Sequence, residues 1–317
     1  MRQDGWMVVT GGAGFIGSHL AEALLNQGHS VRVVDNLTTG RRENLAGLGG
    51  DSFEYLHGDL TEFEVCRRAA EDAVCVFHHA AIPSVPRSIE HPLESHASGP
   101  TATLNMLEAA RLAGARRFIF AASSSAYGET ETLPKHEEML PSPLSPYAAA
   151  KLAGEHYVRV YAQTMGLDGV SLRYFNIFGP RQDPSSPYSG VISRFIRIAL
   201  EGRPLTIHGD GHQTRDFTYV SNAVHANLLA LRAEHPLGGE VLNVGTGVQT
   251  SLLEVVRVLS EILRRPIQPD FAPARFGDIR HSQASLTHIE RLLGYHPLVS
   301  FEDGLRRTLR YAETQTS

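Results

Sequence analysis

The chain has 317 residues, of which 42% are hydrophobic and 20% are charged, a composition typical of a folded globular protein. Its net charge of −5 gives no sign of a nucleic-acid-binding surface, because such surfaces are basic. The two cysteines, Cys66 and Cys75, are too few for a disulfide framework and lack the spacing of metal ligands. No segment has the length and apolar character of a membrane span, and the N-terminus has no signal-peptide core, so we expect a cytoplasmic protein.

Short apolar runs alternate with helix-like segments through the first half of the chain. Strands are expected at Met7–Thr10, Val31–Val34, Phe53–His57, Val74–Phe77, Arg117–Ala122 and Val170–Tyr174. Helices are expected at Ser18–Gln27, Ala97–Ala113 and Ser145–Met165. This alternation predicts an α/β fold, in which a parallel sheet is covered by helices on both faces and the crossovers are right-handed.

After about residue 176 the alternation ends and prolines and glycines become frequent. Helices are expected at Val191–Glu201, Val220–Ala233 and Ser251–Leu263, and the strand-like run Glu240–Val244 is expected to return to the first sheet. We therefore predict a first domain over residues 1–175, with return segments near residues 216–245. A smaller mixed α/β domain, which binds the substrate, is predicted over residues 176–317.

A glycine-rich segment lies between the first expected strand and the first expected helix. It reads Thr10-Gly11-Gly12-Ala13-Gly14-Phe15-Ile16-Gly17, and its glycines allow a close approach of the backbone to a pyrophosphate. The N-terminus of the helix that follows attracts the phosphates. Asp35 ends the second strand, where a carboxylate accepts hydrogen bonds from the adenosine ribose and repels a 2′-phosphate. The pattern predicts a Rossmann-type doubly wound parallel sheet that binds NAD in preference to NADP.

Another acidic residue, Asp59, ends the third expected strand in His57-Gly58-Asp59-Leu60. Its carboxylate could hydrogen-bond the adenine edge of the dinucleotide, or it could cap the next helix. We favour the contact with adenine, and both interpretations stay open here.

Hydroxyl groups and one lysine form the candidate catalytic group. Ser123, Ser124 and Ser125 follow the fifth expected strand, at the sheet edge where open α/β folds bind ligands. Tyr147 and Lys151 are four residues apart and therefore share one face of the helix that follows Ser145. A nearby ammonium favours the phenolate, so Tyr147 could take a proton from a sugar hydroxyl while a hydride leaves for the nicotinamide. In isolation such a Tyr–Lys pair would be only surface packing.

The chain resembles the extended short-chain dehydrogenases that act on nucleotide sugars, the NAD-dependent epimerase/dehydratase family. The segments that carry the resemblance are the glycine loop, Asp59, His78-His79-Ala80-Ala81, Ser123-Ser124-Ser125, Tyr147 with Lys151, Leu172-Arg173-Tyr174-Phe175-Asn176, Gly209-Asp210-Gly211-His212-Gln213-Thr214-Arg215-Asp216-Phe217 and Arg275-Phe276-Gly277-Asp278-Ile279-Arg280-His281-Ser282. Within the family, the greatest similarity is to bacterial UDP-N-acetylglucosamine and UDP-glucose 4-epimerases.

This resemblance implies three sets of site residues. The catalytic set is Ser123, Ser124, Tyr147 and Lys151. The NAD-binding set is Gly11, Gly14, Phe15, Ile16, Gly17, Asp35, Asn36, Asp59, Leu60, Ala80, Ala81, Tyr147, Lys151 and Tyr174. The set that binds the UDP-sugar is Ser84, Val85, Arg87, Ser123, Ser125, Tyr147, Asn176, Val191, Arg215, Arg275, Asp278 and Ser282.

The resemblance also implies particular roles. Tyr174 and Phe175 would approach the nicotinamide, and Asn176 would contact the sugar diphosphate. Arg215 and Arg275 would clamp the two phosphates, as suits guanidinium geometry, unless they are solvated surface charges. Asp278 would bind the uridine ribose or orient Arg275.

The residues that follow Ser123 favour epimerisation over dehydration. Sugar-nucleotide 4,6-dehydratases of the family carry an Asp-Glu pair at the positions of Ser124 and Ser125, and an epimerase needs no such acids. At the position of Ser282 a bulky tyrosine would fill the space that an N-acetyl group needs, so serine favours the acetylated sugar. The chain departs from the family at Gly99 and Ala102, where asparagine and glycine are usual, which puts local substrate positioning in doubt.

Two other classes of function are considered. A lyase, either a dehydratase or a decarboxylase, is disfavoured by the missing acids, and a non-catalytic NAD-binding protein by the presence of both Tyr147 and Lys151. The sixteen histidines are scattered, so no metal site is expected. The helices Ala97–Ala113 and Ser145–Met165 could form a four-helix interface in a homodimer, although their small residues would equally permit close packing on the sheet.

Overall fold

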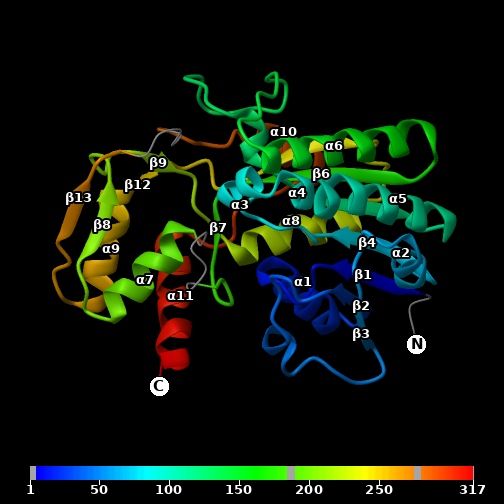
Figure 1. The fold of residues 1–317 in the computed structure, drawn as a ribbon, viewed down its shortest axis with the longest axis horizontal. Coiled ribbons are helices and arrows are strands. Elements are labelled where there is room, and N and C mark those ends of the chain that lie inside the picture. The colour runs from blue at the N-terminus through cyan, green and yellow to red at the C-terminus, as the bar shows by residue number, and fades with distance from the viewer. Residues whose placement is uncertain (1–4, 184–189, 275–279, 317) are drawn as a thin grey trace.

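The computed structural model describes residues 5–183, 190–274 and 280–316. Figure 1 shows a larger lobe built around a central sheet and a smaller lobe beside it, which carries α7, α9, α11, β8 and β13. Within the described ranges, no helix combines the length and apolar character that crossing a bilayer requires.

A seven-stranded sheet forms the centre of the larger lobe. Its strands are β1 Trp6–Thr10, β2 Ser30–Asp35, β3 Phe53–His57, β4 Ala73–His78, β5 Arg117–Ser123, β6 Asp168–Tyr174 and β11 Glu240–Val244. Their spatial order is β11-β6-β5-β4-β1-β2-β3, and each neighbouring pair is parallel. The order reverses between β1 and β4, and ligands bind at such a switch point, outside the carboxyl ends of the strands. The expected Rossmann-type α/β fold is therefore confirmed.

Helices cover both faces of this sheet (Figure 1). On one face lie α1 Phe15–Asn26, α8 Val220–Arg232 and α10 Thr287–Leu293. On the other lie α2 Phe63–Ala70, α5 Ala102–Leu112 and α6 Pro146–Thr164. Successive strand residues point to opposite faces, so Val8 packs into the second core while Val9 packs into the first. Because both faces are covered, the strands are mostly apolar, and this makes them recognisable in the sequence.

The expected helix Ala97–Ala113 is wrong in its first turns. After α3 Val85–Glu90, helical structure resumes at α4 Pro92–His96 and continues as one π-helical turn, η2 Ala97–Thr101, before α5 begins. Pro100 lies inside that turn. Proline has no amide hydrogen, and its ring displaces the carbonyl of the preceding turn, so a regular α-helical ladder cannot pass through it.

The smaller lobe has its own apolar core. Its elements are β7 Ile177–Phe178, α7 Val191–Leu200, β8 Leu205–His208, β9 Thr214–Arg215, β10 Thr218–Tyr219, β12 Thr250–Ser251, α9 Leu252–Leu263, β13 Pro269–Ala272 and α11 Phe301–Thr316. In this core Phe195, Ile207 and Val255 are almost fully buried. The later half of the chain thus contributes to both lobes, since α8, α10 and β11 pack with the central sheet. The domain boundary at residue 175 stays a prediction.

Candidate active site

The glycine loop lies at the carboxyl end of β1, where its backbone is tightly packed. Gly11 has φ +64°, and a Cβ there would lie 2.7 Å from the amide nitrogen of Ala80. A Cβ on Gly17 would collide with the carbonyl oxygen of Gly11. Gly14 is the N-cap of α1 and supplies no side-chain hydrogen bond to the helix, so the helix end can receive an anion. This cradle suits the pyrophosphate of a dinucleotide.

Asp35 is bound to this loop by its carboxylate. One oxygen accepts a hydrogen bond from the amide of Ala13 at 3.0 Å, and the other accepts one from the amide of Leu37 at 2.8 Å. Burial raises the pKa of Asp35, and these two hydrogen bonds oppose that rise. Each carboxylate oxygen has a second lone pair, so Asp35 could still accept hydrogen bonds from a ribose.

Asp59 lies beside Asp35 at the ends of neighbouring strands and is bound locally. It accepts a hydrogen bond from the Asn36 side chain at 2.9 Å and two from Thr61, at 2.8 and 2.7 Å. The alternative that Asp59 caps the next helix is wrong, because the N-cap of α2 is Glu62. Contact with adenine stays a prediction. The Leu60 side chain is buried in the core, which leaves mainly its backbone to face a cofactor.

The residues at the end of β4 pack against the glycine loop and hydrogen-bond to Thr10 at its start. The Ala80 amide donates to the Thr10 hydroxyl at 3.2 Å, and Ala81 follows it at the strand end. The His78 ring is fully buried between the hydroxyls of Thr10, at 2.9 Å, and Thr103, at 3.1 Å. Burial lowers the pKa of His78 well below its usual value, so this histidine is a neutral packing residue.

The catalytic group is assembled from β5 and α6. Ser145 caps α6 by accepting a hydrogen bond from the Ala148 amide at 3.2 Å, which fixes the start of the helix that carries Tyr147 and Lys151. The Tyr147 hydroxyl is hydrogen-bonded to Ser123. Lys151 is 6% exposed, and its ammonium donates to the Ala121 carbonyl at 2.7 Å. The structure therefore brings Ser123, Tyr147 and Lys151 together.

The protonation of this group differs from what we expected. Burial raises the pKa of Tyr147, and its hydrogen bond with Ser123 opposes that rise. Burial also lowers the pKa of Lys151 to about 8, against the attraction of the Glu155 carboxylate. The expected lowering of the tyrosine pKa by the lysine charge is not found in this structure, in which the Lys151 ammonium is bound to the Ala121 carbonyl.

The two hydroxyl residues after Ser123 occupy a short turn. Ser124 begins the 3₁₀ turn η3 Ser124–Tyr127, and Ser125 donates to the Ser123 hydroxyl oxygen at 2.8 Å. No carboxylate stands at either position of this turn, since both are serines. The turn can position and polarise a substrate hydroxyl, but it holds no acid for the elimination of water.

Two residues at the end of β6, Tyr174 and Phe175, have different surroundings. The Tyr174 hydroxyl is 3.0 Å from His79 Nε2 and accepts a hydrogen bond from Asn227 at 2.7 Å. The Phe175 side chain is fully buried and its ring lies against Tyr127, because strand alternation turns it away from the side to which Tyr174 points. Only the backbone of Phe175 is left to approach the nicotinamide, and that contact stays a prediction.

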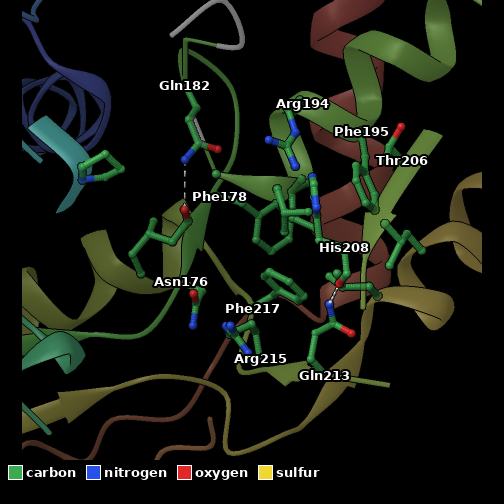
Figure 2. Close-up of a pocket in the computed structure, with 17 residues that line it drawn as sticks. Asn176, Phe178, Gln182, Arg194, Phe195, Thr206, His208, Gln213, Arg215 and Phe217 are labelled. Atoms are coloured by element: carbon green, nitrogen blue, oxygen red, sulfur yellow. Dashed lines mark hydrogen bonds between the residues drawn. The ribbon is translucent and has the colours of Figure 1, made fainter. Parts of the chain in front are cut away.

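A pocket of about 320 Å³ opens where the two lobes meet (Figure 2). Three residues from the expected substrate set, Asn176, Val191 and Arg215, line it. In Figure 2, Asn176 and Arg215 lie near one end, and Arg194 and Gln182 lie near the other. The pocket thus combines guanidinium groups, amides and aromatic rings, a chemistry that suits a nucleotide with its phosphates.

These geometries agree with the comparison of the whole chain with known families. A sequence model described as the NAD-dependent epimerase/dehydratase family matches residues 7–245. The chain belongs to this family. Its cofactor is NAD, with which several solved relatives are bound, and the glycine cradle and Asp35 fit that cofactor.

Relatives in the NAD-dependent epimerase/dehydratase family match nearly the full chain. The UDP-glucose 4-epimerase of Mycolicibacterium smegmatis is 39% identical over 308 residues, covering 96% of this chain and 97% of the relative. The UDP-N-acetyl-alpha-D-glucosaminuronate decarboxylase of Bacillus cytotoxicus is 36% identical, covering 96% of each. The solved UDP-N-acetylglucosamine 4-epimerase of Methanobrevibacter ruminantium has a TM-score of 0.93 at 36% identity, covering 99% of this chain and 100% of that one. This chain is therefore an enzyme of a family whose members act on UDP-sugars.

Several residues that were expected to bind the substrate do not line the pocket between the lobes. Ser84 caps α3, and its neighbour Val85 is partly exposed. Arg87 makes two hydrogen bonds to Glu94, at 3.0 and 2.6 Å. Ser282 is nearly fully buried. Arg275 and Asp278 lie outside the described residues.

Sequence reasoning did not assign most of the pocket residues. The missed polar and aromatic residues include Gln182, Arg194, Phe178, Phe195, Thr206, His208, Gln213 and Phe217. Gln213 and Phe217 lie in a segment that carried the family resemblance, so a signal for them existed. Arg194 carried no such signal, because an arginine on an amphipathic helix resembles a solvated surface charge. Among the described residues, no three His, Cys, Asp or Glu side chains are grouped as metal ligands.

Proposed function

We propose that this enzyme is an NAD-dependent 4-epimerase of UDP-hexoses that interconverts UDP-N-acetylglucosamine and UDP-N-acetylgalactosamine. UDP-glucose and UDP-galactose are proposed as further substrates. The observation that carries the proposal is the assembly of Ser123, Tyr147 and Lys151 at the carboxyl edge of the sheet, followed by hydroxyl residues in place of acids.

The proposed chemistry begins with the sugar 4-hydroxyl between Ser123 and Tyr147. Tyr147, in its phenolate form, receives the hydroxyl proton, and Ser123 holds the oxygen by a hydrogen bond. NAD, when bound, accepts the hydride from C4 and later returns it to the opposite face of the 4-keto sugar. Lys151 holds α6 against β5 through the Ala121 carbonyl and places a positive charge beneath the site.

Reversal of configuration requires the sugar ring to turn while the nucleotide stays bound. Asn176 and Arg215 line a pocket at the junction of the lobes, and we propose that this pocket holds the UDP group. An anchored UDP leaves rotation about the diphosphate linkage free, so the keto sugar can present its other face. A UDP site separate from the catalytic group supports epimerisation in this way.

A lyase activity is the second candidate, because a decarboxylase is among the relatives. A uronate substrate requires a cation for its extra carboxylate. Arg87 is a predicted substrate residue, and it is held by Glu94 in a two-point ion pair. The serines at positions 124 and 125 offer no acid for dehydration. These features favour a neutral hexose and 4-epimerisation.

The preference for the acetylated sugar rests on Ser282. The segment that carries it is bound on both sides, since the Thr214 hydroxyl lies 2.9 Å from His281 and the Lys135 amide donates to the Gln283 carbonyl at 2.8 Å. A serine at this fixed backbone position takes up less space than the tyrosine that would block an N-acetyl group. We propose that Ser282 sets this preference.

We also propose that the enzyme is a cytoplasmic homodimer. Leu112 on α5 and Tyr157 and Val160 on α6 are large apolar side chains exposed on neighbouring helices. Their burial against the same helices of a second copy would form a four-helix interface. Sedimentation velocity of the wild type and of Val160→Glu measures this, and a wild type that sediments as a monomer contradicts it.

The deciding experiment follows the sugar itself. Purified protein, with no added cofactor, is incubated separately with UDP-N-acetylglucosamine and UDP-glucose, and the proton NMR signals of the sugar are recorded. Appearance of the galacto epimer supports 4-epimerisation with resident NAD, and the ratio of the rates measures sugar preference. If neither sugar changes after NAD is supplied, the proposal for UDP-hexoses is wrong.

A further inference from the structure

One face of α6 contacts the sheet through two side chains, one of which belongs to the catalytic group. Tyr147, Lys151 and Glu155 are spaced four residues apart and therefore lie along one face of the helix. Lys151 reaches β5 through the Ala121 carbonyl, 2.7 Å away. Glu155, one turn further on, accepts two hydrogen bonds from Arg173 on β6, at 2.9 and 2.7 Å.

Arg173 contacts the serine turn on its other side. Its guanidinium lies over the ring of Tyr127, 4.5 Å from the ring centroid. Tyr127 ends the η3 turn, which begins directly after Ser123. The Tyr127 hydroxyl donates to Asn243 at 2.7 Å, so the ring under the guanidinium is itself fixed to β11. Arg173 thus contacts both elements that supply the catalytic group.

We propose that Arg173 is a positioning residue that holds the Ser123 turn and the Tyr147–Lys151 helix in register, with Tyr127 and Glu155 as its two attachment points. This inference rests on the proposed function of the same site. Arg173 pairs with Ala122 in the sheet, one residue before Ser123 pairs with Tyr174. It is nearly fully buried and does not line the pocket, so it acts through its neighbours.

Stability alone is a weak reason for this pair. The Arg173 and Glu155 side chains are each 3% exposed, and desolvation of two charges offsets much of their attraction. A guanidinium fork that meets a carboxylate at two points, however, fixes both distance and angle. The Tyr127 ring, which lies under the guanidinium, restricts the orientation of Arg173 further. The arrangement therefore fixes the position of the Ser123 turn relative to α6. A hydrogen bond between Ser123 and Tyr147 requires such a fixed relative position.

The pair also sets the charge near Lys151. The Glu155 carboxylate raises the pKa of Lys151 against the effect of burial. The other titratable groups around Lys151 are Tyr147 on its own helix, His78 at the end of β4 and His79 directly after it, and burial keeps both histidines neutral. Loss of the Glu155 charge is therefore expected to lower the pKa of Lys151 further.

The test compares two buried arginines on neighbouring strands. Arg173 lies near the carboxyl end of β6, and Arg117 lies at the amino end of β5. Arg173→Lys keeps a positive charge but loses the fork and the stacking, and Tyr127→Leu removes the ring while keeping the ion pair. Arg117→Lys is the control, because Arg117 is equally buried and pairs at 2.8 Å with Asp168, which is 18% exposed and lies far from the catalytic edge. Circular dichroism and thermal unfolding first establish that each NAD-loaded variant is folded.

The first measurement needs no substrate. The phenol of Tyr147 is titrated by NMR with isotope-labelled tyrosine, using Tyr147→Phe to assign its signal. Because the hydrogen bond with Ser123 lowers the pKa of Tyr147, loss of register is expected to raise that pKa in Arg173→Lys and Tyr127→Leu. Arg117→Lys is expected to titrate as the wild type does. An unchanged Tyr147 pKa in both test variants overturns the inference.

The second measurement is turnover of the UDP-hexose. Misplacement of a catalytic group by about 1 Å costs up to roughly 100-fold, so kcat is expected to fall at least about tenfold in both test variants while KM changes less than about twofold. A kcat that falls only in proportion to the folded fraction, as for Arg117→Lys, contradicts positioning. If the wild type converts no UDP-hexose, the proposed function is wrong, and the titration still decides the role of Arg173.

Discussion

The Lys151 ammonium and the Ala121 carbonyl oxygen are 2.7 Å apart and form a hydrogen bond between α6 and β5. Ala121 lies two residues before Ser123, so this bond connects the helix that carries the candidate base to the strand that carries its hydroxyl partner. The burial that accompanies it lowers the pKa of Lys151 to about 8. Lys151 is therefore expected to change its charge near pH 8.

The first prediction concerns pH. Below a pKa of about 8, Lys151 is charged and makes a charge-assisted hydrogen bond to the Ala121 carbonyl, which holds α6 against β5; above it, the amine is neutral and this bond is weaker. We expect kcat to fall as pH rises through about 8. Lys151→Arg keeps its charge at all these pH values, so this alkaline limb should disappear in the variant. A limb that persists in Lys151→Arg would assign it to another group.

The second prediction concerns the base. Tyr147→Phe removes the hydroxyl that hydrogen-bonds Ser123 and is expected to lower kcat by at least about 100-fold. Tyr157→Phe is the matched control, because Tyr157 is on the same helix and partly exposed. Turnover is measured by NMR of the sugar, with NAD content determined for each protein. Equal turnover in the two variants would exclude Tyr147 as the base.

The third prediction concerns cofactor retention. Gly17→Ala places a Cβ against the Gly11 carbonyl, so the loop must shift and the purified protein should lose most of its NAD. Gly49→Ala is the control, because a Cβ there meets open space. Bound nucleotide is quantified after denaturation. Full NAD occupancy in Gly17→Ala would mean that the loop does not hold the pyrophosphate.

The fourth prediction concerns the pocket. Arg194→Ala removes a guanidinium that lines it, and the loss of a charge-assisted hydrogen bond is expected to weaken UDP binding by roughly tenfold or more. Calorimetric titration with UDP measures the change, and Arg257→Ala on the exposed face of α9 is the control. Unchanged affinity in Arg194→Ala would remove this pocket residue from the nucleotide site.

The fifth prediction concerns sugar preference. Ser282→Tyr fills the proposed N-acetyl space and should abolish turnover of UDP-N-acetylglucosamine while turnover of UDP-glucose remains. Ser282→Ala, which keeps the space, should retain both activities. Retention of acetylated-sugar turnover in the tyrosine variant would show that Ser282 does not set the preference.

Local patterns were enough to predict the sheet lobe. A strand buried on both faces must be apolar, and a glycine loop between such a strand and a helix has few other uses, so β1 and α1 could be recognised from neighbouring residues. Ser145 and Pro146 likewise marked the start of α6 before the structure was known. The break at Pro100 was missed although a proline inside a helical pattern is itself a signal for one, because the small residues on both sides continue to favour a helix.

The pocket was harder to predict because its residues meet only through tertiary packing. Arg194 comes from α7 and Thr206 from β8, and nothing in their local sequence relates them. Phe175 is a related case, because strand alternation turns its side chain into the core, and the spacing of residues does not show which of two neighbours faces the site. The lowered pKa of Lys151 depends on burial, which no spacing of residues reveals.

The position of β11 in the sheet has a consequence for how the protein is made. This strand pairs with β6 but lies about seventy residues later in the chain, after α7 and β8 of the smaller lobe. A nascent chain that has emerged only to Tyr174 therefore has an unpaired edge at β6 and lacks α8 from one face of the sheet. The sheet is complete only after synthesis passes Val244, so a fragment that ends at residue 175 is expected to be prone to aggregation.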